Sequence, residues 1–140
     1  MIMPDVNVVI GAMRQDNPRH SQLRAWLAAA VQSDEPLGLS TLVLVGVTRI
    51  ITNPRVFAVP TPLDDVVAEL NRLIRHPRTV VVNPGPRHWE IFRRLGQVTG
   101  FRGPALADIQ HAAVAIEHDA TWVSLDRDFA RVPGLRWELP

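Results

Sequence analysis

Residues 1–12, MIMPDVNVVIGA, place an aspartate and an asparagine inside a run of strand-forming apolar residues. The branched side chains of this run predict a buried strand over residues 2–10. A carboxylate inside a buried strand is strongly unfavourable unless a positive charge compensates it. Asp5 must therefore be exposed, pair with a basic side chain, or bind a metal ion.

The composition is that of one globular domain over residues 1–140, since 46% of the residues are hydrophobic and 21% are charged. The absence of cysteine excludes disulfides, thiolate metal sites and a cysteine nucleophile. No apolar run approaches the roughly 20 residues of a membrane helix, and no signal peptide is recognisable. We therefore expect a soluble, cytoplasmic protein with no membrane association.

Apolar runs that predict strands recur along the chain. TVVV (79–82) and ATWVSLD (120–126) predict strands, LGLS (37–40) predicts a short strand or the lead into one, and LRWEL (135–139) predicts a short last strand. Helical patterns lie between these runs. Strands that alternate with helices indicate a parallel sheet that is covered on both faces.

Apolar residues at helical spacing predict four helices, which follow Pro18, Pro62, Pro86 and Pro104. The segment TLVLVGVTRIIT (41–52) is ambiguous, because its branched residues favour a strand while its spacing also fits one helical face. The residues predicted to face inward from the four helices are Leu23, Trp26, Leu27, Ala30, Val66, Val67, Leu70, Leu73, Ile74, Trp89, Phe92, Leu95, Ile109, Ala112, Ala113 and Ile116.

Four aspartates lie where such a sheet presents its binding site, beyond the carboxyl ends of the strands. Asp126 ends the strand over 120–126, and Asp128 follows two residues later. Asp5 lies in the first strand, and Asp108 lies in the first turn of a helix. Each also has a structural explanation, such as a helix dipole, a turn or an arginine partner.

Together, the four carboxylates suggest a cation site. Carboxylates in one place repel each other unless a cation neutralises them. Without cysteine, an all-oxygen ligand set indicates Mg²⁺ or Mn²⁺, and these ions assist phosphate chemistry. No motif of a nucleotide-binding P-loop, a dinucleotide-binding fold or a serine hydrolase occurs.

Several polar residues near these aspartates are candidate supporting groups. Asn7 either holds Asp5 by a hydrogen bond or turns the chain. Ser124 is placed to touch a phosphate or a metal-bound water. His111, three residues after Asp108, is interpreted as a structural or solvated histidine.

Five motifs in this order resemble the PIN domain and, more narrowly, the VapC-type toxins of bacterial toxin–antitoxin pairs. They are DVNV (5–8), TRIITNPRVF (48–57), ADIQHAAVAIEH (107–118), SLDRDF (124–129) and LRW (135–137). No single motif is specific, but their order and spacing are, and the similarity runs nearly end to end.

The resemblance implies a three-layer α/β/α sandwich with a mainly parallel central sheet, in which residues 41–52 are helical. It implies an endoribonuclease that depends on Mg²⁺ or Mn²⁺, a small VapB-type antitoxin as partner, and a homodimer. By matching motif, Asp5, Asp108 and Asp126 are the catalytic, metal-binding acids. Asp128 is either a further metal ligand or a turn residue.

One position departs from the family pattern. Many PIN nucleases carry a glutamate in the helix after the second strand, where this chain has Gly46 or a neighbouring valine, and no acid occurs between Glu35 and Asp64. Two outcomes are open: a nuclease that works with the remaining acids, or a protein that binds RNA or a partner with weak or no nuclease activity. We favour the nuclease, because the other three acids are present.

All 15 basic residues are arginine, and the formal net charge is +1. Guanidinium groups suit phosphate recognition, although the codon bias of a GC-rich genome explains the same composition. Arg49, Arg102 and Arg127 are the candidates for contacts with RNA phosphates at the rim of the site.

Overall fold

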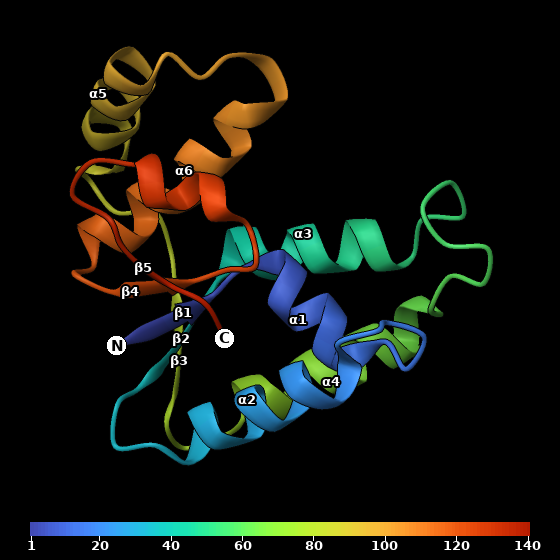
Figure 1. Cartoon of the computed structure of the whole chain (residues 1–140). Coiled ribbons are helices and arrows are strands. Elements are labelled where there is room, and N and C mark those ends of the chain that lie inside the picture. The colour runs from blue at the N-terminus through green and yellow to red at the C-terminus, as the bar shows by residue number, and fades with distance from the viewer.

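A five-stranded parallel sheet forms the centre of the computed structural model, which describes residues 1–140 (Figure 1). Its strands are β1 (Ile2–Pro4), β2 (Leu37–Ser40), β3 (Thr79–Val82), β4 (Thr121–Val123) and β5 (Arg136–Glu138). They lie in the order β3-β2-β1-β4-β5, and every pair is parallel. Because parallel neighbours need long crossover connections, helices separate most of these strands along the chain.

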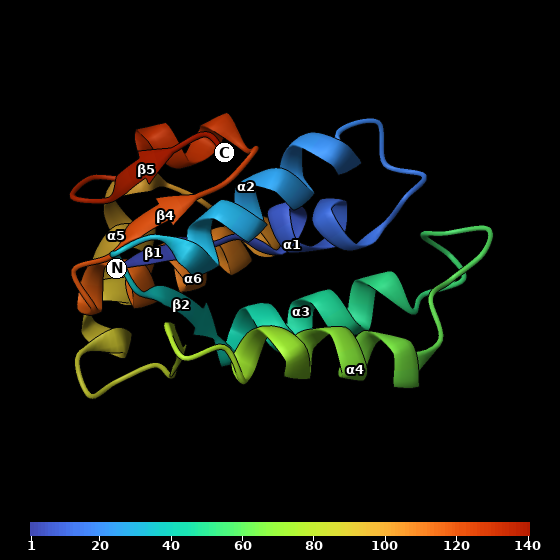
Figure 2. The ribbon, with the colours of Figure 1, turned by 90° about the horizontal axis from the view of Figure 1, so that it is seen from below.

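Six α-helices cover this sheet: α1 (Val6–Met13), α2 (His20–Gln32), α3 (Thr41–Ile51), α4 (Leu63–Ile74), α5 (His88–Thr99) and α6 (Leu106–Glu117). Helices α5 and α6 lie on one side of the strands, and α2 and α4 lie on the other (Figure 1). Figure 2 shows α3 and α4 running side by side beyond β2. The predicted α/β/α sandwich is confirmed. None of the helices has the length and apolar character needed to cross a membrane.

The core has two parts, one on each face of the sheet. On one face, Leu37 and Leu39 of β2 pack with buried residues of α1 and α2. On the other face, Trp122 of β4 is fully buried beside a row of alanines of α6 that includes Ala112 and Ala113. Small side chains let a helix approach the sheet closely. The N-terminal turn of α6, which carries Asp108, is fixed against the sheet in this way.

The predicted strand over residues 2–10 is wrong beyond Pro4, because helix α1 begins at Val6. The Asp5 carboxylate accepts a hydrogen bond from the Val6 backbone N–H at 2.6 Å, which caps the helix. Branched residues have low helix propensity, but Val8 packs in one part of the core and Val9 in the other. Burial on both sides therefore outweighs local propensity.

The ambiguous segment 41–52 is the helix α3, as the resemblance implied, and the Ser40 hydroxyl caps it by accepting from the Leu42 N–H at 3.2 Å. Two predicted core positions are wrong: Trp89 is 69% exposed and Val67 is 43% exposed. Trp89 lies two residues before the buried Ile91, and residues at that spacing occupy different faces of a helix.

Candidate active site

Asp5, Asp108 and Asp126 reach one cleft from three separate elements. Asp5 directly follows β1, Asp108 lies in the first turn of α6, and Asp126 caps the short 3₁₀ helix Arg127–Arg131 that follows β4. Strands β1 and β4 are neighbours with Pro4 paired to Val123, so their carboxyl ends lie at the same level. All three aspartates line a cleft of about 680 Å³.

The Asp5 carboxylate is held by a hydrogen-bond network that joins the ends of β1 and β4. Its Oδ2 atom accepts from the Ser124 hydroxyl at 2.6 Å and from Asn7 Nδ2 at 2.8 Å, and Oδ1 accepts from the Val6 N–H. The Asn7 Oδ1 atom accepts from the Leu125 N–H at 3.2 Å. Asn7 therefore holds Asp5, which is one of its two predicted roles. Ser124 is fully buried, so its hydroxyl supports Asp5 and does not reach the cleft.

The three aspartates have no ion-pair partner, because the six salt bridges of the chain involve other groups. Burial raises the pKa of Asp5 to about 6, the hydrogen bonds it accepts offset only part of this, and the charges of Asp108 and Asp126 raise it further. Burial, followed by the charges of Asp126 and Asp128, also raises the pKa of Asp108. The cleft therefore gathers carboxylates that disfavour one another's ionisation.

The donor set of this cleft fits a hard divalent cation. The polar lining offers mainly carboxylate and amide oxygens and has no sulfur, and its one arginine, Arg49, forms no salt bridge with the carboxylates. No group of three or more histidine, aspartate or glutamate side chains is arranged as a ready-made metal site. Mg²⁺ typically binds through one or two carboxylates and keeps several waters, so it does not require such a group. Asp5, Asp108 and Asp126 are the residues that would hold the ion.

Asp128 lies outside the cleft lining. Its backbone N–H donates to Asp126 Oδ1 at 2.8 Å, and its exposed carboxylate lies 3.8 Å from an Arg131 guanidinium nitrogen. Of the two roles predicted for Asp128, these contacts are those of a turn residue. Asp128 still acts on the cleft at longer range, through the effect of its charge on Asp108.

The three candidate arginines occupy different environments. Arg49 of α3 lines the cleft and has no carboxylate partner. The Arg102 guanidinium donates to the backbone carbonyls of Gly96 in α5 at 3.3 Å and of Phe101 in the following loop at 2.8 Å, so it is occupied by these groups. Arg127 is exposed and is not part of the cleft lining. Only Arg49 is thus placed to meet a ligand in the cleft.

Gly46 explains why this cleft has no acid on α3. Gly46 lines the cleft, and a Cβ atom added to it would lie 2.9 Å from the Cγ2 atom of Val6 in α1. This separation is too short for a normal contact, so a side chain at position 46 would require Val6 to shift. Val45 lines the cleft beside it and is 65% exposed. The α3 wall of the cleft therefore carries apolar residues and Arg49, and it has no carboxylate.

Three further residues line the cleft but were not predicted from the sequence to contact a ligand: Asn17, Gln110 and His111. The spacing of three residues between Asp108 and His111 was a usable signal, because such residues share a helix face. Asn17 and Gln110 left no comparable signal, since only the folded chain brings them to the cleft.

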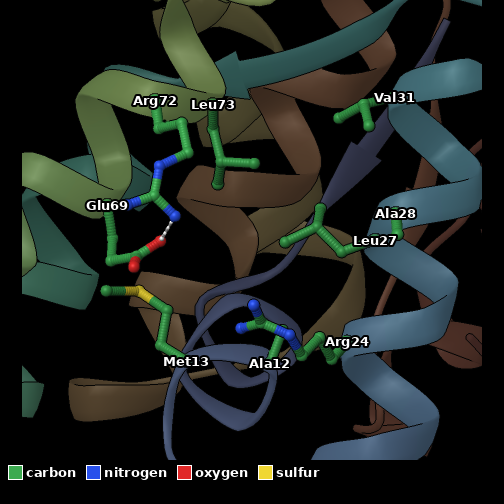
Figure 3. Close-up of a pocket in the computed structure, with 9 residues that line it drawn as sticks. All are labelled: Ala12, Met13, Arg24, Leu27, Ala28, Val31, Glu69, Arg72 and Leu73. Carbon is green, nitrogen blue, oxygen red and sulfur yellow. Dashed lines mark hydrogen bonds and ion pairs between the residues drawn. The ribbon is translucent and has the colours of Figure 1, made fainter.

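A second hollow of about 170 Å³ lies between α2 and α4 and has a different character (Figure 3). Leu27 and Val31 of α2 face Leu73 of α4 across it, and the Glu69–Arg72 ion pair, at 3.0 Å, lies on its α4 side. It contains no cluster of unpaired carboxylates. The aspartates without ion-pair partners therefore lie in the first cleft and not in this hollow.

Comparison with known proteins gives a consistent picture. The family model of the PIN domain matches residues 2–135. A protein of Mycobacterium bovis named VapC ribonuclease Mb2897 is 42% identical over 140 residues, which cover all of this chain and 95% of that protein. Ribonuclease VapC25 of Mycobacterium tuberculosis is 36% identical over 136 residues, which cover 97% of this chain and 96% of that protein.

Among solved structures, VapBC2 from Rickettsia felis bound to a DNA fragment from its promoter superposes with a TM-score of 0.73. The sequence identity is 19%, and the match covers 99% of this chain and 98% of the other. The VapC20 toxin of Mycobacterium tuberculosis superposes with a TM-score of 0.64 at 14% identity, covering 97% and 99% of the two chains. At these identities the likeness shows a common fold.

Proposed function

Because the chain belongs to the PIN domain family, and within it to the VapC ribonucleases, we propose that it cleaves RNA phosphodiester bonds as the toxin of a toxin–antitoxin pair. The observation that supports this most is the convergence of Asp5, Asp108 and Asp126, all without ion-pair partners, in one cleft. In this proposal the chain is one domain over residues 1–140. It acts in the cytoplasm, forms a homodimer and is inhibited by a small VapB-type antitoxin.

The cofactor in this proposal is Mg²⁺, with Mn²⁺ as the alternative. Asp5, Asp108 and Asp126 would hold it. When bound, a divalent cation provides a nucleophilic water at neutral pH and offsets the negative charge of the reacting phosphate. Asp128 contributes negative charge at longer range. Burial first, and then the charges of neighbouring carboxylates, raise the pKa values of Asp5 and Asp108, and a bound cation would favour their ionised forms.

The protein's own residues prepare the cleft for RNA. Ser124 and Asn7 fix the Asp5 carboxylate before any ligand arrives, so no reorganisation is needed when RNA binds. Arg49 provides positive charge for a phosphate next to the reacting one. The apolar α3 wall, which includes Val45, provides surface on which unstacked bases of single-stranded RNA can pack.

The direct test is RNA cleavage by the purified chain with and without a divalent cation. We expect single-stranded RNA to be cleaved in Mg²⁺, cleavage to stop in EDTA, and activity to return when Mg²⁺ is added in excess. An Asp5→Asn preparation made in parallel controls for contamination. Equal cleavage by the variant, or cleavage that persists in EDTA, would assign the activity to a contaminating ribonuclease and contradict the proposal.

A matched pair of arginine variants tests the orientation of RNA in the cleft. Arg49→Ala should weaken RNA binding and reduce the slope of log Kd against log salt by about 0.7, the value for one phosphate contact on a single strand. Arg102→Ala should leave both quantities unchanged, because that guanidinium is bonded to backbone carbonyls. Fluorescence anisotropy across a salt series measures both. The opposite ranking would place the RNA path outside this cleft.

A further inference from the structure

His111 occupies a fixed position in the acidic cleft, one turn of α6 beyond Asp108. Its imidazole ring stacks on the indole of Trp122, with ring centroids 5.4 Å apart and an angle of 19° between the planes. Trp122 is fully buried in the core and lies on β4, so its indole ring is held in place by the sheet and the core. The stack therefore sets the plane of the imidazole before any ligand enters.

The ring carries a polar atom that the fold does not satisfy. The Nδ1 atom of His111 is buried and has no hydrogen-bond partner. The Nε2 atom of the same ring is not among the buried atoms that lack a partner. Burial lowers the pKa of His111 to about 4, so the ring is neutral at physiological pH. An unsatisfied buried N–H group is rarer than an unsatisfied acceptor. The proton of the neutral ring therefore belongs on Nε2, which leaves Nδ1 as the bare nitrogen.

Packing alone does not account for a histidine at this position. A phenylalanine ring would stack on Trp122 in the same way, and it would bring no unsatisfied nitrogen into the core. Removing a buried polar atom that lacks a partner is neutral or stabilising when the shape is kept. The histidine thus lowers the stability of the folded chain relative to an apolar ring of the same shape. A role other than stabilising the fold would explain its presence.

We propose that His111 is an RNA-binding residue of the ribonuclease, whose Nε2–H donates a hydrogen bond to an oxygen of the RNA strand in the cleft. This inference rests on the proposed function. An uncharged donor is suited to this place, because a cationic ring would pair with Asp108 and compete with a metal ion for the carboxylates. The neutral ring instead offers RNA a donor without neutralising the acids.

The test is His111→Phe, which keeps the stack on Trp122 and removes both nitrogens. We expect its unfolding temperature to equal or exceed that of the wild type. Its Kd for a mixed-sequence single-stranded RNA, measured by anisotropy in EDTA so that no metal-dependent cleavage occurs, should rise about tenfold. With Mg²⁺ present, KM should rise by a similar factor and kcat should change little. His111→Gln, which retains an N–H donor, should recover part of the affinity.

Each outcome decides the inference. An unchanged Kd and KM in His111→Phe would overturn it, whatever the unfolding temperature, because a structural residue affects stability and not RNA affinity. A weakened Kd that His111→Gln fails to improve, accompanied by a lower unfolding temperature, would also overturn it by indicating damage to the fold. A wild-type chain that neither binds nor cleaves RNA would contradict the proposed function itself. Wild-type cleavage with an insensitive His111→Phe would contradict the role of His111 alone.

Discussion

Asp108→Asn is expected to lower the rate of RNA cleavage by about a hundredfold or more, while the metal-free protein remains at least as stable as the wild type. The substitution keeps the size of the side chain and removes one of the charges that converge on the cleft. In the wild type, burial and the charges of Asp126 and Asp128 disfavour the ionised form of Asp108 and raise its pKa. Cleavage assays in Mg²⁺ and thermal unfolding in EDTA measure the two halves of this prediction.

Asp65→Asn is the matched control, because Asp65 is the third residue of α4 as Asp108 is the third residue of α6. Both aspartates interact favourably with a helix N-terminus, an effect of about 0.3–1 kcal/mol. Asp65 lies outside the cleft, so its variant should lose this small stabilisation and retain full activity. If Asp108→Asn cleaves RNA as fast as Asp65→Asn does, the acidic cleft is not the catalytic site.

The sheet was predictable from sequence because four of its strands, β1 to β4, lie in short apolar runs between helical patterns. Helix α1 was not predictable from sequence, since its local sequence pattern favours a strand. Val6, Val8 and Val9 form a branched run that favours a strand, yet Val8 and Val9 belong to the two different parts of the core. A helix that is buried on several sides loses the periodicity that distinguishes it from a strand. The cap by Asp5 is the one local signal for its start.

The carboxylates of the cleft could be located from sequence because they follow strand ends or lie in a first helical turn. The contacts that hold these carboxylates in place could not be predicted from sequence. The Ser124 hydroxyl and the Asp5 carboxylate are 119 positions apart in the chain, and no local pattern links them. The same holds for Gly46, whose lack of a side chain matters only because Val6 packs against it. Such contacts follow from the tertiary fold, which places β1 beside β4 and α1 against α3.

Relative to the Asp5→Asn variant, the metal-free wild type is expected to lose stability as the pH rises from about 4 to about 6, and Mg²⁺ is expected to reverse this loss above pH 6. The pKa of Asp5 is about 6 in the folded chain, against 3.8 for an unperturbed aspartate. At Asp5 the folded state therefore binds more protons than the unfolded state within this window, whereas burial lowers the pKa of His111 to about 4 and gives the opposite slope, which is common to the wild type and the Asp5→Asn variant. The stabilising contribution is complete below pH 3.8 and is lost as the pH passes the folded pKa. The two values correspond to about 3 kcal/mol at most.

Metal binding has the opposite pH dependence, because a cation binds the ionised carboxylate and competes with the proton. The increase in unfolding temperature caused by Mg²⁺ should therefore be small below pH 6 and grow as the pH rises above it. Thermal unfolding in EDTA and in Mg²⁺, over about pH 5 to 8, gives both curves. Asp5→Asn should remove the Asp5 contribution from the metal-free curve, which leaves a rise in stability with pH from His111, and it should also weaken the Mg²⁺ effect, since it removes a ligand of the ion. A Mg²⁺ effect that does not vary with pH in the wild type would show that the cation binds away from Asp5.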